Sequence, residues 1–261
     1  MNDNMSEISP LAYIDPLAKI GKNCKIGPFV FIDKNVIIGD DNEIMPNANI
    51  LEYAHIGNGN KIFPGAVISA VPQDLKFAGE VTTAEIGDNN LIRENVTINR
   101  GTKSKGKTVV GSNNLLMEGV HIAHDCVLGN GCIIGNQTKV AGEVIVDDNS
   151  IISAAVLIHQ FCRIGGYGML QGGRAASMDI PPYIIAGRSP LTYCGLNLIG
   201  LRRRKFSTKR IENIRQAYRY IYEMGFNTTI AVKKIEEEME MTDDIKYIVD
   251  FIKNSHRGII K

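Results

Sequence analysis

Residues 20–50 have the sequence IGKNCKIGPFVFIDKNVIIGDDNEIMPNANI, with an isoleucine at every sixth position. The spacing extends from Ile14 to Leu170, where nearly every sixth residue is Ile, Leu or Val. The exceptions are Asp74, Glu80 and Ser104. Neither a helix, with its period of 3.6, nor an alternating strand gives a period of six. A coil of three short flat faces does, because each face contributes one aliphatic side chain to a shared interior, so the sequence predicts a parallel β-helix.

Two further positions of the six-residue unit support this prediction. The residue after the aliphatic one is often glycine, which we expect where the backbone bends sharply or takes a positive φ. Four residues after the aliphatic one, the side chain is usually small, which indicates a second inward-facing position. Four cysteines occupy this small position, so we expect core packing and not metal ligation from Cys24, Cys126, Cys132 and Cys162.

The repeat is interrupted twice, near 70–85 (AVPQDLKFAGEVTTAE) and near 100–108 (RGTKSKGKT). The six-residue phase is preserved after both interruptions, which predicts loops that leave a continuous prism and return to it. Loops inserted into a regular solenoid usually carry function, because the regular structure does not need them.

The chain changes character after the repeat ends. A segment punctuated by Pro and Gly leads into three stretches with helical spacing of apolar residues, beginning near Ser207, Asn227 and Thr242. We therefore expect two domains, a β-helix over 1–190 and a helical domain over 191–261.

Composition restricts the class of protein. A hydrophobic content of 44% excludes a disordered chain, and the N-terminal MNDNMSEISP lacks the features of a targeting signal. No apolar stretch is long enough for an integral membrane span, and the five cysteines form no disulfide framework, so we expect a cytoplasmic protein. A net charge of +1 with no strongly basic stripe argues against nucleic-acid binding.

Three of the five histidines lie close together in the repeat. His121, His124 and His159 occupy three different positions of the six-residue unit, none of them an inward-facing one, so we expect all three outside the prism. A single surface histidine commonly has no role, but three within about two coils favour a functional site.

Several segments carry a specific resemblance. They are QDLKFAGE (73–80), IRENVTINRGT (92–102), NLLMEGVHIAHDC (114–126), HQFCRIG (159–165), DIPPY (179–183) and GLNLIGLRRRKF (195–206). With the repeat, they resemble the UDP-N-acetylglucosamine O-acyltransferases of lipid A biosynthesis over essentially the whole chain. The resemblance implies a left-handed β-helix that forms a homotrimer with sites between subunits.

The resemblance also implies a reaction. Family members transfer an (R)-3-hydroxyacyl chain from acyl carrier protein to the 3-hydroxyl of UDP-N-acetylglucosamine, the first step of lipid A biosynthesis. No metal or separate cofactor is implied, because the phosphopantetheine of acyl carrier protein carries the acyl donor.

Site residues follow from the same matching. His124 corresponds to the general base, and Asp125 would orient it, which requires two side chains adjacent in sequence to meet. Gly142 corresponds to the glycine whose N–H faces the thioester oxygen, although an ordinary turn glycine is the alternative. The matched substrate-binding positions are Asp74 and Lys76 for the sugar nucleotide, His121, His159 and Gln160 for the sugar and acyl site, and Asn197, Arg203 and Arg204 for the nucleotide or its phosphates.

Some positions bear on specificity. Gly172 corresponds to a residue that limits acyl length, and glycine there predicts a long 3-hydroxyacyl chain. The basic run Arg202 to Lys205 is either a solvated charge cluster or a surface that attracts acidic acyl carrier protein. The chain departs from many members of the family at Asn99, Glu143 and Ile199, where we expect altered substrate contacts.

Three alternatives remain. The related hexapeptide N-acyltransferase has an additional N-terminal domain, for which a repeat that begins by Ile14 leaves no room. A hexapeptide carbonic anhydrase would bind zinc through three histidines between subunits. A non-catalytic hexapeptide scaffold would have no use for the inserted QDLK loop beside a His-Asp pair.

Overall fold

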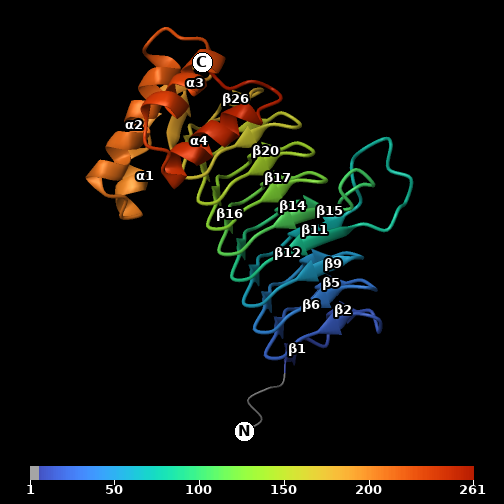
Figure 1. The fold of residues 1–261 in the computed structure, drawn as a ribbon. Helices are drawn as coiled ribbons and strands as arrows, with labels where there is room; N and C mark the ends of the chain where they lie inside the picture. The colour runs from blue at the N-terminus through green and yellow to red at the C-terminus, as the bar shows by residue number, and fades with distance from the viewer. Residues whose placement is uncertain (1–5) are drawn as a thin grey trace.

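The computed structural model describes residues 6–261. The first five residues, which belong to the expected 1–190 domain and to the N-terminal segment without targeting features, lie outside the described residues. The chain winds into a prism of stacked coils with helices at one end (Figure 1). Each coil contributes one short strand to each of three sheets. Partners in neighbouring regular coils are 18 residues apart, as Ile8 and Ile26 are. The coil therefore contains three of the six-residue units found in the sequence.

The first sheet contains β1 (Glu7–Ile8), β4 (Lys25–Ile26), β7 (Glu43–Ile44), β10 (Lys61–Ile62), β13 (Leu91–Ile92), β16 (Leu115–Leu116), β19 (Ile133–Ile134), β22 (Ile151–Ile152), β25 (Met169–Leu170), β27 (Ile184–Gly187) and β28 (Thr192–Leu196). The second contains β2 (Tyr13–Ile14), β5 (Phe31–Ile32), β8 (Asn49–Ile50), β11 (Val67–Ala70), β14 (Thr97–Asn99), β17 (His121–Ile122), β20 (Lys139–Val140), β23 (Leu157–Ile158) and β26 (Ala175–Ala176). The third contains β3 (Lys19–Ile20), β6 (Ile37–Ile38), β9 (Ala54–Ile56), β12 (Thr83–Ile86), β15 (Lys107–Val110), β18 (Val127–Leu128), β21 (Ile145–Val146) and β24 (Arg163–Ile164).

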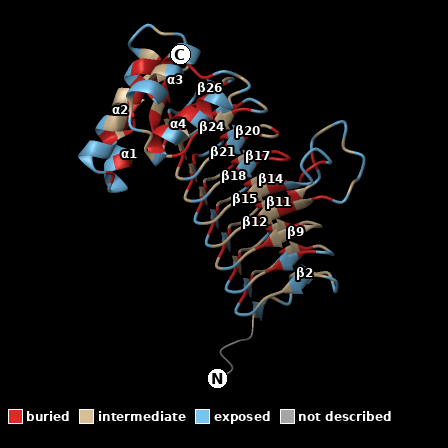
Figure 2. Cartoon of the chain, viewed as in Figure 1, coloured by how far each residue is buried: buried red, intermediate tan, exposed pale blue. Residues whose placement is uncertain are grey.

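The predicted aliphatic core is confirmed. The second residue of most two-residue strands points inward, and Ile98, Ile122 and Val140 stack directly on one another in the second sheet. The inward side chains are almost completely buried, while the outer surface of the coils is exposed (Figure 2). The four cysteines at the small position are fully buried, as expected for core packing. The hydrophobic effect along this column is the main stabilising contribution to the prism.

The reason for the repeated glycines differs from the one expected. The left-handed backbone conformation is found two residues after the glycine position, for example at Asn23 with φ of 54° and Asn35 with φ of 57°. The glycines instead permit close stacking, because a Cβ at Gly57 would lie 2.8 Å from the carbonyl oxygen of Gly87 in the next coil. The positive-φ positions commonly hold Asn, Asp or Gly, which tolerate that conformation best.

A ladder of buried asparagines, not anticipated from the sequence, occupies the small position in several coils. Asn42, Asn60, Asn90 and Asn114 are each at most 2% exposed. The Oδ1 of Asn60 accepts hydrogen bonds from the backbone N–H of Asn90 at 2.9 Å and from its Nδ2 at 3.0 Å. Asn90 in turn accepts from the N–H of Asn114 at 2.9 Å. The ladder satisfies backbone groups at a corner that the strands leave unpaired.

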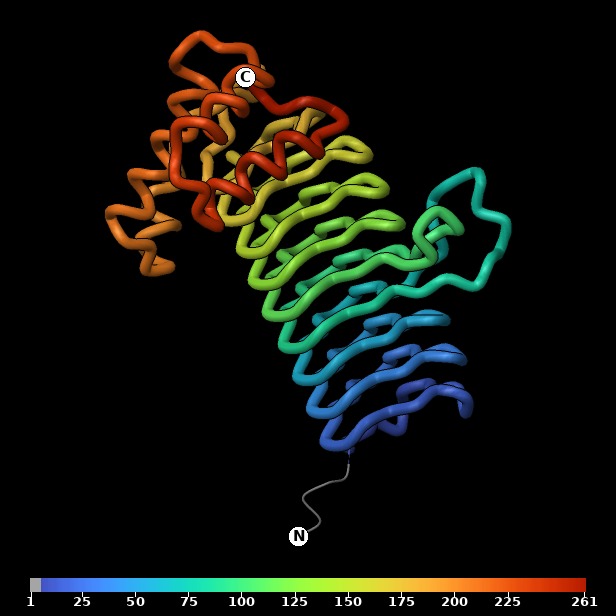
Figure 3. The backbone as a smooth tube through the Cα atoms, in the orientation of Figure 1, coloured from blue at the N-terminus to red at the C-terminus, as the bar shows by residue number. Residues whose placement is uncertain are grey.

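The chain leaves the prism at two places, between β11 and β12 and between β14 and β15, and both excursions project from the same side (Figure 3). They correspond to the two interruptions of the repeat. The first is therefore a loop over 71–82 and the second a loop over 100–106.

Three predicted helices are confirmed at the C-terminal end, as α2 (Thr208–Tyr222), α3 (Thr228–Glu238) and α4 (Asp243–Lys253). The Oγ of Ser207 and the Oδ1 of Asn227 cap the first two. A short helix, α1 (Leu198–Arg203), was not predicted, because six residues are too few to show a helical period. Within residues 6–261, no helix combines the length and the apolar character that a bilayer crossing requires.

The junction between the prism and the helices is continuous. Strand β28 begins after the boundary expected at residue 190, yet it pairs antiparallel with β27. Sheet hydrogen bonds therefore cross that position, and the division into 1–190 and 191–261 stays a prediction.

Candidate functional site

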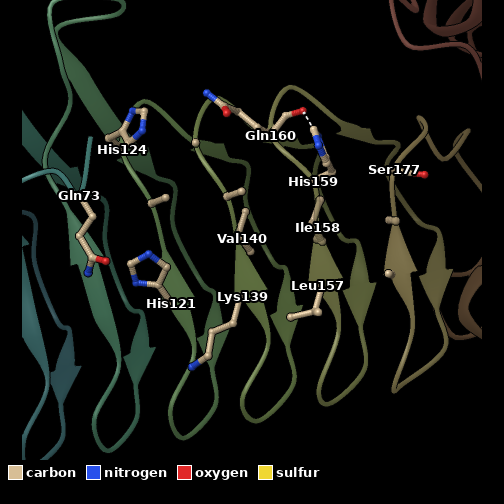
Figure 4. A pocket seen from close by; sticks show the side chains of 15 residues that line it. Gln73, His121, His124, Lys139, Val140, Leu157, Ile158, His159, Gln160 and Ser177 are labelled. Atoms are coloured by element: carbon tan, nitrogen blue, oxygen red, sulfur yellow. Dashed lines mark hydrogen bonds between the residues drawn. The ribbon is translucent and has the colours of Figure 1, made fainter. Parts of the chain in front are cut away.

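One edge of the prism gathers several of the predicted residues. His124, Gly142 and Gln160 each follow a strand of the second sheet by two residues, and the three strands, β17, β20 and β23, are consecutive neighbours in that sheet. These residues therefore lie in successive coils along one edge, where Figure 4 shows the side chains of His124 and Gln160. They line a pocket of about 520 Å³, a volume typical of ligand sites, to which His121 and His159 also contribute.

His124 and Asp125 form a hydrogen-bonded pair. The distance from Nδ1 of His124 to Oδ2 of Asp125 is 2.8 Å, and the carboxylate side chain is fully buried. The pairing is possible because Asp125 has a φ of 61°, which turns its side chain back toward the preceding residue. With Nδ1–H donated to the carboxylate, Nε2 is the ring nitrogen left to accept a proton. The geometric requirement for this pair, stated from the sequence, is met.

Gly142 lies against the imidazole of His124. A Cβ at this position would be 2.6 Å from Cε1 and 2.7 Å from Nε2 of His124, closer than any side chain tolerates. Gly142 does not adopt a positive φ, so a turn conformation does not require glycine here. Glycine is required because a side chain would collide with the imidazole ring. The glycine thus lets the imidazole and the backbone of the next coil approach each other.

The other two histidines are placed outside the core, as expected. The Nδ1 of His121 is 2.7 Å from Oγ1 of Thr97. Burial lowers the pKa of His121, and the neighbouring Lys139 and His124 lower it further. His159 is exposed, with Nδ1 3.0 Å from the carbonyl oxygen of Gln160.

The loop over 71–82 approaches the same pocket. It begins after β11 of the second sheet, and Gln73 reaches the pocket wall (Figure 4). Asp74 does not line the pocket in the single chain; its Oδ1 accepts from the N–H of Lys76 at 2.9 Å, which shapes a turn. Lys76 is exposed. The two residues predicted to bind the sugar nucleotide therefore follow the pocket residue Gln73 in the loop but do not line the pocket.

Other pocket residues were missed from the sequence. They are the outward-facing residues of the second sheet that follow His121, namely Lys139, Leu157 and Ala175, each 18 residues from the one before. The signal was available, because counting every eighteenth residue from His121 would have found them.

Four predicted residues lie away from this pocket in the single chain. Gly172 follows β25 of the first sheet and so occupies a different edge of the prism. Asn197 is the N-cap of α1, where its Oδ1 accepts from the N–H of Gly200 at 3.2 Å and its Nδ2 donates to the carbonyl oxygen of Tyr167 at 2.9 Å. Arg203 and Arg204 are exposed at the end of the same helix. The single chain does not bring them to His124.

The three departures differ in their surroundings. Asn99 is buried, and its Nδ2 donates to the carbonyl oxygen of Val71 at 2.9 Å. Glu143 accepts from Oγ of Ser104 at 3.2 Å, and Ile199 is 68% exposed. Over the part of the chain that the structure describes, no three His, Cys, Asp or Glu side chains are arranged to hold a metal ion.

Comparison with known proteins shows which family the chain resembles. A model described as UDP N-acetylglucosamine O-acyltransferase, domain 2, matches residues 179–260, and one described as bacterial transferase hexapeptide matches 35–70 and 107–142. An acyl-(acyl-carrier-protein)–UDP-N-acetylglucosamine O-acyltransferase from Stenotrophomonas maltophilia is 44% identical over 263 residues, covering 100% of both chains. The chain belongs to the UDP-N-acetylglucosamine O-acyltransferase family. The predicted membership is confirmed.

Solved structures of this acyltransferase family extend the comparison. A UDP-N-acetylglucosamine acyltransferase from Bacteroides fragilis is 69% identical, with a TM-score of 0.96, covering 97% of this chain and 100% of that one. One from Francisella novicida is 38% identical, with a TM-score of 0.94, covering 97% and 93%. The left-handed parallel β-helix with C-terminal helices is thereby confirmed.

Proposed function

We propose that the protein transfers an (R)-3-hydroxyacyl chain from acyl carrier protein to the 3-hydroxyl of UDP-N-acetylglucosamine, the first step of lipid A biosynthesis. The proposal rests mainly on the imidazole of His124, which is hydrogen-bonded through Nδ1 to the buried Asp125 and lies beside Gly142 in the pocket wall. The relatives' printed names supply the substrates.

His124 acts as the general base in this proposal. Its Nε2 removes the proton from the sugar hydroxyl as the oxygen attacks the thioester carbonyl carbon. The N–H of Gly142 stabilises the negative charge on the carbonyl oxygen. The tetrahedral intermediate then breaks the carbon–sulfur bond, and the phosphopantetheine thiolate leaves with the proton that His124 carries. No metal and no bound cofactor take part.

The remaining site residues are assigned to a homotrimer. Asp74, Lys76, His121, His159 and Gln160 contact the sugar nucleotide or the acyl chain, and Asn197, Arg203 and Arg204 hold the nucleotide. The second group lies away from His124 in one chain, which is the arrangement expected if a neighbouring subunit completes each site. We propose that the protein acts in the cytoplasm, where acyl carrier protein is available.

Gly172 leaves room for a long acyl chain in this proposal. Its ideal Cβ would lie 2.9 Å from the carbonyl oxygen of Ala154, closer than a Cβ normally approaches a backbone atom, so glycine keeps this part of the edge free of a side chain. Bulk at this position would therefore shorten the space along the edge.

The test is an assay of the purified protein with UDP-N-acetylglucosamine and a set of 3-hydroxyacyl carrier proteins of increasing length. We expect an O-acyl ester product, with long donors preferred. No turnover with any donor would contradict the transfer reaction, and a preference for short donors would contradict the role of Gly172. Transfer to an amino sugar with an amide product would favour the N-acyltransferase.

A further inference from the structure

The carboxylate of Asp125 is held mainly by the loop over 100–106, for which neither the sequence resemblance nor the proposed reaction assigns a role. Its Oδ2 accepts from Oγ1 of Thr102 at 2.6 Å as well as from His124. Its Oδ1 accepts from the N–H of Thr102 at 2.9 Å and from the N–H of Lys105 at 3.2 Å. Three of the four donors therefore come from this loop, two of them from one threonine.

The strand that follows the loop, β15, contacts the same residue. The N–H of Asp125 donates to Oγ1 of Thr108 at 2.8 Å, which supports its left-handed backbone conformation. Thr102 and Thr108 are 6% and 0% exposed, so solvent does not compete with either contact. A fully buried carboxylate that lost a donor would be left with an unsatisfied oxygen and would move to recover a partner.

The loop can return to the prism because residue 101 is a glycine. A Cβ at this position would lie 2.3 Å from the backbone nitrogen of Lys107, a backbone atom that cannot move aside. The loop is also tied to the neighbouring one over 71–82, because Glu80 accepts from the N–H of Lys103 at 3.0 Å and Oγ1 of Thr82 donates to the carbonyl oxygen of Gly101 at 2.5 Å. The carboxylate, the imidazole and the loop that carries Gln73 thus form one connected unit.

We propose that Thr102 is a positioning residue for acyl transfer, whose hydroxyl holds the Asp125 carboxylate where it orients the His124 imidazole. Thr102 does not line the pocket and touches His124 only through Asp125. This inference rests on the proposed function, since it assumes that His124 is the base. Its effect should therefore appear in the chemical step and not in sugar-nucleotide binding.

The experiment compares the full-length parent with three variants of the loop and with His124→Ala. Thr102→Val keeps the shape of the side chain and the backbone N–H but removes the hydroxyl donor, and we expect kcat to fall about 10- to 100-fold, the effect of losing a hydrogen bond to a charged group. The KM for UDP-N-acetylglucosamine should stay within about two-fold. Thr102→Ser, which retains the hydroxyl, should restore most of kcat. Ser104→Ala, on the same loop but without a side-chain contact to Asp125, is the matched control and should match the parent.

The outcomes separate this inference from the proposed function. Parental kcat in Thr102→Val, or equal losses in Thr102→Val and Thr102→Ser, would overturn the positioning role. If His124→Ala is inactive while Thr102→Val is fully active, only this inference fails; if His124→Ala is itself active, the proposed base fails. Thermal unfolding of each variant checks folding, and Thr102→Ala replaces the valine variant should that one not fold, with the same expected split between kcat and KM.

Discussion

His124 and Gly142 make contact across neighbouring coils, and their proximity gives the first prediction. Gly142→Ala places a methyl group within 2.7 Å of the imidazole nitrogen, so the ring must rotate and weaken its bond to Asp125. We expect turnover to fall about 100-fold, as misplacement of a catalytic group by about 1 Å can do. The measurement is kcat together with the thermal midpoint, which should change little because the ring can move.

Parental turnover in Gly142→Ala would show that the orientation of His124 does not limit the reaction.

At the same scale, the sequence allowed part of the site to be predicted. His124, Gly142 and Gln160 were assigned through the family resemblance, and the structure brings them together because they occupy equivalent positions in consecutive coils of one sheet. Thr102 could not be placed, because it lies in a loop outside the repeat, where periodicity carries no information. The side-chain bonds of Asn197 to Gly200 and Tyr167 depend on a helix too short to recognise.

At the scale of elements, the asparagine ladder carries a prediction. Asn90→Ala leaves the buried N–H of Asn114 without its acceptor, which should cost about 1–3 kcal/mol of stability. Asn49→Ala is the control, because its Nδ2 donates to the nearby carbonyl oxygen of Asn47 at the surface. Thermal unfolding should therefore show a lower midpoint for Asn90→Ala alone, and equal shifts would contradict a structural role for the ladder.

The strands themselves were predictable because each needs only one inward aliphatic side chain, repeated in register with the coil below. The backbone conformation of each corner was harder to predict. The glycine after Ile56 permits stacking of coils, whereas residues such as Asn23 and Asn35 take the left-handed conformation. Both kinds of residue mark a turn in sequence, and only coordinates distinguish a close approach from a positive φ.

At the scale of the whole molecule, α4 is attached to the prism by a half-buried pair. The hydroxyl of Tyr247 donates to Oδ2 of Asp147 at 2.6 Å and accepts from the N–H of Gly166 at 2.7 Å. Burial raises the pKa of Asp147, although its bond to Tyr247 and the charge of Arg163 oppose that change. This contact joins residues 100 positions apart and was not visible in the sequence.

The direction of this shift predicts a pH dependence. Because the pKa of Asp147 is higher in the folded protein than in the unfolded chain, its ionisation disfavours folding as pH rises from its usual value through the raised one. Asp147→Asn keeps an acceptor for Tyr247 and removes that ionisation. We expect the variant to gain thermal stability relative to the parent at neutral pH, with a smaller gain near the usual pKa of an aspartate. A gain that grows as pH falls would contradict the assignment.

The central claim is that the prism fixes an imidazole beside an incoming thioester, and His124→Ala tests it most directly. The substitution removes the base without filling the pocket, so the initial rate of 3-hydroxyacyl transfer to UDP-N-acetylglucosamine should fall about 10²- to 10⁴-fold. The thermal midpoint should be retained, and so should the proposed trimer. A folded variant that transfers acyl chains at a near-normal rate would contradict the claim.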